Sequence, residues 1–201
     1  MLVIWGRINS HNVKKVMWGA IECGLAYERR EMGGSFGYTP EYLAKNPNRL
    51  VPMIEDGEVA VWESNAILRY LAAAHAPALW PADPAARAMG DQWMDWQFLY
   101  ADAQRDAFLG CVRGGKDGSD PVVAKSAETC AALMAMLDDR LARTPFLTGT
   151  AFGIADIPMG TYAHTWFSLP IERPSLPHVE AWMDRLRQRP GFQTIAAVPF
   201  T

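Results

Sequence analysis

The chain has 201 residues, of which 50% are apolar, 20% are charged and 11% are aromatic. This composition supplies a packed core and carries too little charge for a disordered chain. The formal net charge of −3 provides no basic field for wrapping nucleic acid or for holding an acidic lipid surface, so we expect neither partner.

The start of the chain and its cysteines indicate a soluble, cytoplasmic protein. Residues 1–7 lack a basic region followed by an apolar run, which a secretory signal needs, and no apolar run reaches the roughly 18 residues of a membrane-spanning helix. Cys23, Cys111 and Cys130 are odd in number and far apart, so neither a disulfide framework nor a zinc knuckle fits. We therefore expect a reducing compartment and no metal.

The first third of the chain predicts an α/β domain. Residues 2–5 form a compact apolar run typical of a strand, and apolar residues recur at helical spacing from Val13 to Ile21. Gly24 ends this helix, and residues 25–32 continue in an extended pattern. A glycine-rich loop and a short helix at residues 40–45 follow.

A hairpin and a third helix complete this domain. Residues 51–55 and 58–62 are predicted strands on either side of Asp56-Gly57, a dipeptide that favours tight hairpins. Helical spacing then predicts a helix that begins near Glu63 and ends before Pro77. The predicted order is βαβαββα.

Beyond this point the patterns are helical. Three prolines between residues 77 and 84 mark a stiff connector, so we divide the chain into a first domain at residues 1–77, a linker at 78–85 and an all-α domain at 86–201. Two long helices lie on either side of a break at residues 113–120, and shorter helices are predicted at 154–166 and 177–187.

The loop before the first helix places Ser10, His11 and Asn12 at a helix N-terminus, where unpaired N–H groups and the helix dipole stabilise an anion such as a thiolate. Cys23 lies at the other end of this helix, so the sulfur would have to come from a ligand. A hydrogen bond from Ser10 or Asn12 would lower the pKa of that thiol. The alternative is that Ser10 or Asn12 only caps the helix.

Two further segments bear on this choice, NPNRLVPMIEDG at residues 46–57 and WESNAILRYL at 62–71. With them the sequence strongly resembles a cytosolic glutathione transferase of the bacterial, theta-like type, over essentially the whole chain. The resemblance implies a thioredoxin-like first domain, a helical-bundle second domain and a homodimer. It also implies glutathione as co-substrate.

The resemblance implies where glutathione binds. A cis bond before Pro52 would expose the N–H and C=O of Val51, which pair with the cysteine backbone of glutathione as an added antiparallel strand. Ser64, at a helix start, would bind the γ-glutamyl carboxylate, and Glu63 would pair with the neighbouring ammonium. The alternative for Glu63-Ser64 is an ordinary N-cap.

The same resemblance makes Ser10 the leading residue to activate the thiol, with Asn12 second. Arg49 is assigned the glycyl carboxylate of glutathione. Residues 152–158, FGIADIP, resemble the buried capping box of the family, with Gly153 in place of the hydroxyl residue. Asp156 is accordingly expected to be structural.

The expected reaction is attack of the stabilised thiolate on an apolar electrophile, as in detoxification. A glutathione-dependent isomerase, dehalogenase or disulfide reductase on the same fold remains an alternative, as does a non-catalytic ligand-binding or interaction protein. Trp93, Trp96 and Tyr100 either line the acceptor pocket or pack in a core or dimer contact. The acceptor site stays unassigned.

Overall fold

The computed structural model describes all residues from 1 to 201 and divides into two compact units. The first unit comprises Met1–Pro81 and Pro190–Pro199, and the second comprises Ala82–Arg189 and Phe200–Thr201. Residues 190–199 thus group with the first unit, whereas we predicted them to be part of the second domain.

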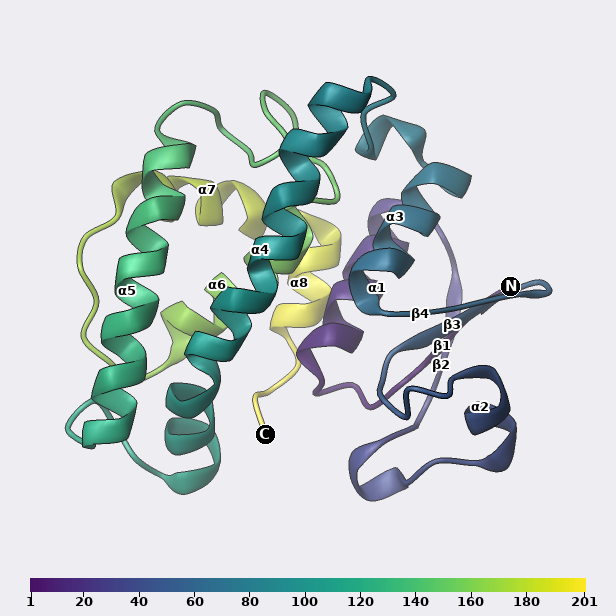
Figure 1. The fold of residues 1–201 in the computed structure, drawn as a ribbon, viewed down its shortest axis with the longest axis horizontal. Coiled ribbons are helices and arrows are strands. Elements are labelled where there is room, and N and C mark those ends of the chain that lie inside the picture. Colours follow the sequence, from purple (N-terminus) through teal and green to yellow (C-terminus); the bar gives the residue numbers. More distant parts are fainter. The chain divides into compact units, whose positions relative to one another are not determined.

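The first unit follows the predicted order βαβαββα and adds a helix from the end of the chain (Figure 1). Its elements are β1(Leu2–Trp5), α1(His11–Glu22), β2(Tyr27–Arg30), α2(Pro40–Lys45), β3(Met53–Asp56), β4(Val59–Trp62), α3(Ser64–His75) and α8(Pro190–Ala196), with short 3-10 turns at Gly34–Phe36 and Pro77–Leu79. Strand β3 begins two residues later than predicted. Pro52 has no N–H to donate to a strand ladder, which ends the strand there.

The sheet has the strand order β2-β1-β3-β4, with β1 parallel to β2 and antiparallel to β3. Trp5 at the end of β1 pairs with Met53 at the start of β3, and Met53 in turn pairs with Trp62 at the end of β4. This register brings three junctions to one end of the sheet: the loop after β1, the segment before β3 and the turn into α3.

Side chains alternate across the two faces of β1. Trp5 joins Met32, Tyr42 and Met53 in a buried cluster, so helix α2 packs on this face. Ile4 points the other way and is fully buried, and α1 and α3 lie against each other beside the sheet (Figure 1). The first unit is therefore a sheet between two helical layers, as in a thioredoxin-like fold.

Helix α8 packs on α1. The ring of Phe192 meets Trp18 edge-on, with 5.3 Å between centroids. A Cβ added at Gly191 would lie 2.2 Å from Trp18 Cδ1, so only glycine lets the two helices approach this closely. This contact explains why the C-terminal segment belongs to the first unit.

The second unit is all α, as predicted. It consists of α4(Pro84–Phe108), a π-helical segment at Leu109–Arg113, α5(Pro121–Leu141), α6(Asp156–Ser168) and α7(Pro177–Arg187). Helices α4 and α5 start with the same signal, because Asp83 and Asp120 each accept hydrogen bonds from backbone N–H groups of the first turn and a proline follows.

The aromatic stripe on α4 packs inside the second unit. Tyr100 is fully buried and Trp93 nearly so, and the rings of Trp93 and Trp96 meet edge-on at 5.2 Å. Tyr100 also meets Tyr162 of α6, at 6.5 Å. Of the two interpretations left open for the stripe, core packing is the one that these contacts favour.

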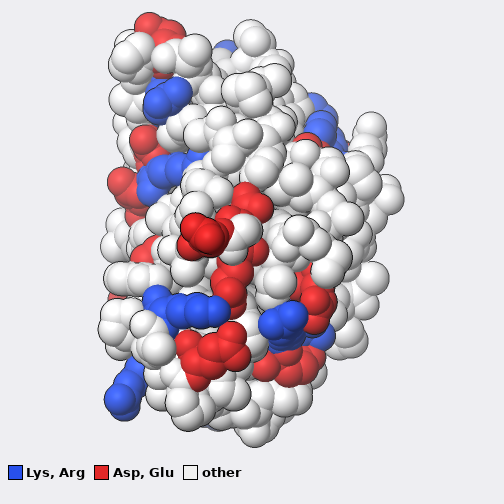
Figure 2. Space-filling model, turned by 90° about the vertical axis from the view of Figure 1, so that its right-hand side faces the viewer, with Lys and Arg blue, Asp and Glu red and all other residues white.

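Charged side chains of both signs lie close together on one face of the molecule. On the face drawn in Figure 2, Lys and Arg groups lie next to Asp and Glu groups rather than in one basic field. Lys45, for example, contacts both Glu41 and Glu55. None of the helices combines the length and apolar character needed to cross a membrane.

Candidate functional site

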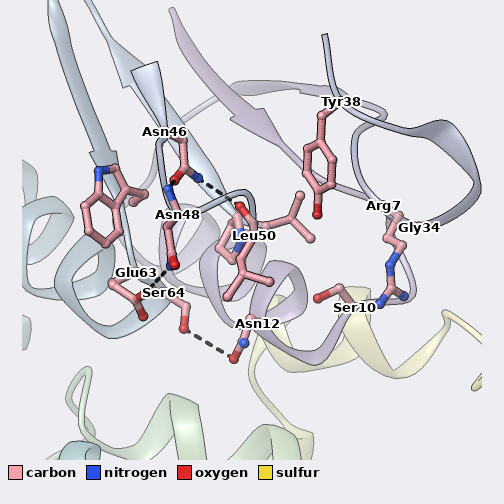
Figure 3. Close-up of a pocket in the computed structure, with 13 residues that line it drawn as sticks. Arg7, Ser10, Asn12, Gly34, Tyr38, Asn46, Asn48, Leu50, Glu63 and Ser64 are labelled. Carbon is pink, nitrogen blue, oxygen red and sulfur yellow. Dashed lines mark hydrogen bonds between the residues drawn. The ribbon is translucent and has the colours of Figure 1, made fainter. Parts of the chain in front are cut away.

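A cavity of about 230 Å³ opens in the first unit where the three junctions meet (Figure 3). Six of the seven residues predicted for the site line this cavity: Ser10, Asn12, Val51, Pro52, Glu63 and Ser64. Arg49 does not. It is exposed and has a φ of 58°, so the glycyl contact assigned to it stays a prediction.

Ser10 occupies the N-cap position of α1 without acting as a side-chain cap. Its φ and ψ are −75° and 128°, and its hydroxyl makes no hydrogen bond to the helix or to any other protein group. The residue is 8% exposed, and its oxygen points into the cavity (Figure 3). Since the hydroxyl faces the open cavity, it is available to a ligand.

Asn12 and Ser64 connect the starts of two helices. The Ser64 hydroxyl donates to Asn12 Oδ1 over 3.3 Å (Figure 3), which joins the first turn of α3 to that of α1. Both helices therefore present N-terminal N–H groups and the positive end of a dipole at the cavity. This favours bound anions at two points.

Glu63 precedes α3 in an unusual backbone conformation. Its φ of 70° lies in the left-handed region, which a residue other than glycine adopts at a cost and which is frequent at functional sites. It provides no side-chain cap to α3. Its Oε1 instead accepts a hydrogen bond from Asn48 Nδ2 at 3.0 Å, so the ordinary N-cap alternative does not describe Glu63.

Val51 contributes its backbone. The bond to Pro52 is cis, as the sequence resemblance implied. The Val51 N–H and C=O pair with no other backbone group, because regular pairing of β3 starts at Met53. Tyr42 Oη and Asn46 Nδ2 both donate to the preceding carbonyl of Leu50 and hold this segment in place.

Lys15 lies on the buried face of α1 and does not line the cavity; we did not predict its role from the sequence. Its Nζ donates to Asn65 Oδ1 at 3.0 Å, next to Ser64. Burial lowers the pKa of Lys15 to about 7, against the attraction of Glu63, which raises it. The sequence signal was faint, because a helical pattern assigns a lysine to the solvent side by default.

None of the three cysteines supplies a thiolate. All are free thiols, and burial raises the pKa of Cys23 and of Cys130 to about 11 and also raises that of Cys111. Cys23 is the C-cap of α1, at the opposite end from Ser10. An anionic sulfur at the start of α1 must therefore come from a bound molecule.

Comparison with known proteins agrees with this geometry. The family model "Glutathione S-transferase, N-terminal domain" matches residues 2–73 and "Glutathione S-transferase, C-terminal domain" matches residues 100–190. Glutathione S-transferase GstB of Escherichia coli K12 is 37% identical over 206 residues, which cover 99% of each chain. Glutathione S-transferase 3 of Zea mays is 32% identical over 214 residues, 98% of this chain and 95% of the maize protein.

Among solved structures, the theta-class glutathione S-transferase of Xanthomonas axonopodis pv. citri with glutathione bound superposes with a TM-score of 0.92. It is 48% identical in sequence, and the match covers 100% of this chain and 99% of that one. The chain belongs to the glutathione S-transferase family. The family and the two-part fold predicted from the sequence are thereby confirmed.

Proposed function

We propose that this protein is a glutathione transferase whose cavity in the first unit binds glutathione and stabilises its thiolate. The observation that carries the proposal is the Ser10 hydroxyl, which faces the cavity at the N-terminus of α1 and has no partner in the protein. The bound glutathione of the Xanthomonas relative supports the choice of ligand.

The site offers a complementary group to each part of the tripeptide. The N–H groups at the start of α3 and the Ser64 hydroxyl suit the γ-glutamyl carboxylate, while Glu63 suits its ammonium. The free N–H and C=O of Val51 suit the cysteine backbone as an added strand. Antiparallel pairing then directs the glycyl end towards Leu50 and Tyr38.

The chemistry follows from the thiol position. A free thiol has a pKa of ~8.5 and is only a few per cent ionised at neutral pH. The Ser10 hydroxyl donating to sulfur, together with the dipole of α1, favours the anion and lowers that pKa. The thiolate attacks an electrophilic carbon, a C–S bond forms, and a leaving group such as chloride departs with the bonding pair.

A glutathione-dependent isomerase, dehalogenase or disulfide reductase would use the same glutathione site and differ from a transferase only in its acceptor, so comparison of acceptor substrates separates these functions. A reductase with its own sulfur would need a thiolate at the start of α1, where this chain has Ser10. A non-catalytic ligand-binding protein would bind glutathione without accelerating the conjugation of chlorodinitrobenzene. We further infer a cytoplasmic homodimer, which size-exclusion mass at micromolar concentration tests.

The test of the proposed function is titration of glutathione by calorimetry, followed by conjugation of chlorodinitrobenzene. We expect saturable binding and a rate well above the uncatalysed reaction. Loss of binding in Glu63→Gln and Ser64→Ala would locate the tripeptide in the cavity, and Arg49→Ala tests the remaining glycyl assignment. A protein that binds no glutathione would contradict the proposal.

A further inference from the structure

Arg7 lies in the same turn as Ser10. Its carbonyl oxygen accepts a hydrogen bond from the Ser10 N–H over 3.2 Å, and its own N–H donates to the Met32 carbonyl over 3.0 Å. The residue is half-buried and lines the cavity beside Ser10 (Figure 3). The backbone thus fixes Arg7 on the same side of the cavity as the hydroxyl that faces the thiol.

The absence of a side chain at Gly34 leaves room for the Arg7 side chain. A Cβ added at Gly34 would lie 3.0 Å from Arg7 Cδ and 3.1 Å from its Nε, and Gly34 has a φ of 61°. A larger residue at position 34 would therefore both strain the backbone and displace the guanidinium. The loop before α2 leaves room for the arginine at this point.

The charge of Arg7 is not neutralised by the protein. Nη1 donates to the neutral amide oxygen of Asn9 at 2.8 Å, and no carboxylate forms an ion pair with Arg7. Arg29 and Arg30, on the neighbouring strand β2, pair with Glu31 and Glu28. A guanidinium has five N–H donors and matches a carboxylate in a two-point contact, so Arg7 can take up an anion.

Arg7 could bind either of two carboxylates. One is the carboxylate of the glycyl residue of glutathione, and the other is a carboxylate on the acceptor. Antiparallel pairing at Val51 carries the glycyl end towards Leu50 and Tyr38, whereas the sulfur turns towards Ser10. Arg7 shares a turn with Ser10 and is on the sulfur side. The molecule that meets the sulfur there is the electrophile.

We propose that Arg7 binds a carboxylate on the acceptor, so that this enzyme prefers electrophiles carrying a negative charge near the reacting carbon. The inference rests on the proposed function and refines it, since the sequence analysis expected an apolar acceptor. The attraction orients the electrophile and brings its carbon to the thiolate.

A matched pair of acceptors tests this. Chlorodinitrobenzoate and chlorodinitrobenzamide react by the same step, in which the C–S bond forms and chloride leaves with the bonding pair, and they differ in one charge. The measured quantity is the kcat/KM for the benzoate divided by that for the benzamide. We expect Arg7→Gln to lower this ratio at least about tenfold, in keeping with the loss of a charge-assisted hydrogen bond.

Two further variants make the result specific. Arg7→Lys keeps the charge but loses the two-point contact, so the ratio should fall less than in Arg7→Gln. Arg143→Gln removes an exposed arginine after α5 and should leave the ratio at the wild-type value.

Other outcomes separate the sources of the carboxylate. An equal loss of kcat/KM for both acceptors in Arg7→Gln would overturn the proposal and assign Arg7 to the thiolate. It would also be overturned if glutathione ethyl ester had a raised KM with the wild type but not with Arg7→Gln, because Arg7 would then bind the glycyl carboxylate. A wild type that conjugates neither acceptor would contradict the proposed function itself, and the Arg7 assignment with it.

Discussion

At the scale of single residues, Ser10 differs from Asn12 in one respect that matters for the chemistry. The Ser10 hydroxyl has no protein partner, whereas Asn12 Oδ1 already accepts from Ser64. A hydroxyl can donate its proton to a thiolate, and it needs no rearrangement to do so. Asn12 Nδ2 is an amide donor that this bond leaves available, so the order of the two residues stays a prediction, with Ser10 first and Asn12 second.

Substitution of the two residues should separate these roles. Ser10→Ala removes a hydrogen bond to a charged sulfur, worth about 1.5–3 kcal/mol, so we expect kcat/KM at neutral pH to fall about tenfold or more and its pH profile to shift to higher pH. Steady-state conjugation of chlorodinitrobenzene against pH measures both effects.

The control for this pair is Ser175→Ala, at an exposed serine of the second unit, which should leave the profile unchanged. An unaltered profile in Ser10→Ala together with a large loss in Asn12→Ala would transfer the activating role to Asn12.

Lys15 should impose a pH dependence on stability. Its pKa is about 7 in the folded protein, whereas a lysine in the unfolded chain has a pKa of about 10.5. Between these two pH values the unfolded chain therefore holds a proton that the folded protein lacks. The free energy of unfolding should therefore rise with pH over this window, by about 1.4 kcal/mol for each unit of separation. Below about pH 7 the contribution of Lys15 to the free energy of unfolding is constant and lowers the stability of the folded protein.

Urea unfolding of wild type and Lys15→Met between about pH 6.5 and 10 measures this. The wild type should gain several kcal/mol relative to the variant as the pH rises. Burial also lowers the pKa of Lys14, to about 8. Lys14 is present in both proteins, so its effect on the free energy of unfolding cancels in the comparison. For Lys125→Met, at an exposed lysine, the free energy of unfolding should change with pH as it does in the wild type. The same pH dependence in Lys15→Met would contradict the argument.

At the scale of elements, the sequence predicted more of the fold than of the cavity. A compact apolar run located β1, helical spacing located α1 and α3, and Pro177 at a first helical turn marked α7, because each of these signals lies within its own element. Register is not local, however. That Trp5, Met53 and Trp62 align follows from pairing across the sheet, and this alignment brings Arg7 and Tyr38 to the same cavity as Ser64.

Six of the residues that line the cavity were singled out from the sequence. Ser10 and Asn12 stood out by their place at a helix start, and the other four belong to Val51-Pro52 and Glu63-Ser64, short motifs with fixed spacing that carry the family resemblance. Arg7, Tyr38 and Asn48 carry no such signal. Each is a common polar residue in a loop, and only the folded chain shows that it lines the cavity.

Asp156 organises the start of α6, as the sequence led us to expect. Its Oδ1 accepts from the Leu147 N–H and from Trp182 Nε1 on α7, at 2.8 and 2.9 Å. Its Oδ2 accepts from the Gly153 N–H at 3.1 Å and from the hydroxyl of Thr148 at 3.0 Å. No hydroxyl takes the place of the one that Gly153 lacks, since Thr148 donates to the carboxylate while the Asp156 N–H donates to the Gly153 carbonyl at 3.0 Å.

Asp156→Asn should destabilise the protein. Burial raises the pKa of Asp156 while its four hydrogen bonds oppose the rise, and an asparagine would turn an NH2 group towards two of these donors. Leaving buried donors unpaired costs about 3 kcal/mol or more in all. Urea unfolding followed by circular dichroism measures the loss, and Asp139→Asn, at an exposed aspartate, should show almost none.

At the scale of the whole molecule, the end of the chain completes the first unit. No sequence pattern predicted that residues 190–199 belong to the first unit. They do so because Phe192 contacts Trp18, and these two residues are 174 positions apart in the chain. Proximity of this kind is set by packing and not by local spacing.

Phe192→Ala should therefore destabilise the first unit. Phe192 is 3% exposed, and truncation of a buried phenylalanine costs about 3–5 kcal/mol. Tryptophan fluorescence during urea unfolding should report an earlier transition. Phe98→Ala, at a phenylalanine that is 45% exposed, is the matched control, and equal midpoints for the two variants would refute the structural role of α8.

The central claim is that the cavity holds glutathione with its sulfur ionised. Ultraviolet absorbance of the bound thiolate, titrated against pH in the wild type and in Ser10→Ala, tests it most directly. We predict a thiol pKa in the wild-type complex at least about one unit below the free value of ~8.5, and a return towards that value in Ser10→Ala. A bound thiol that titrates like free glutathione in the wild type would contradict the account.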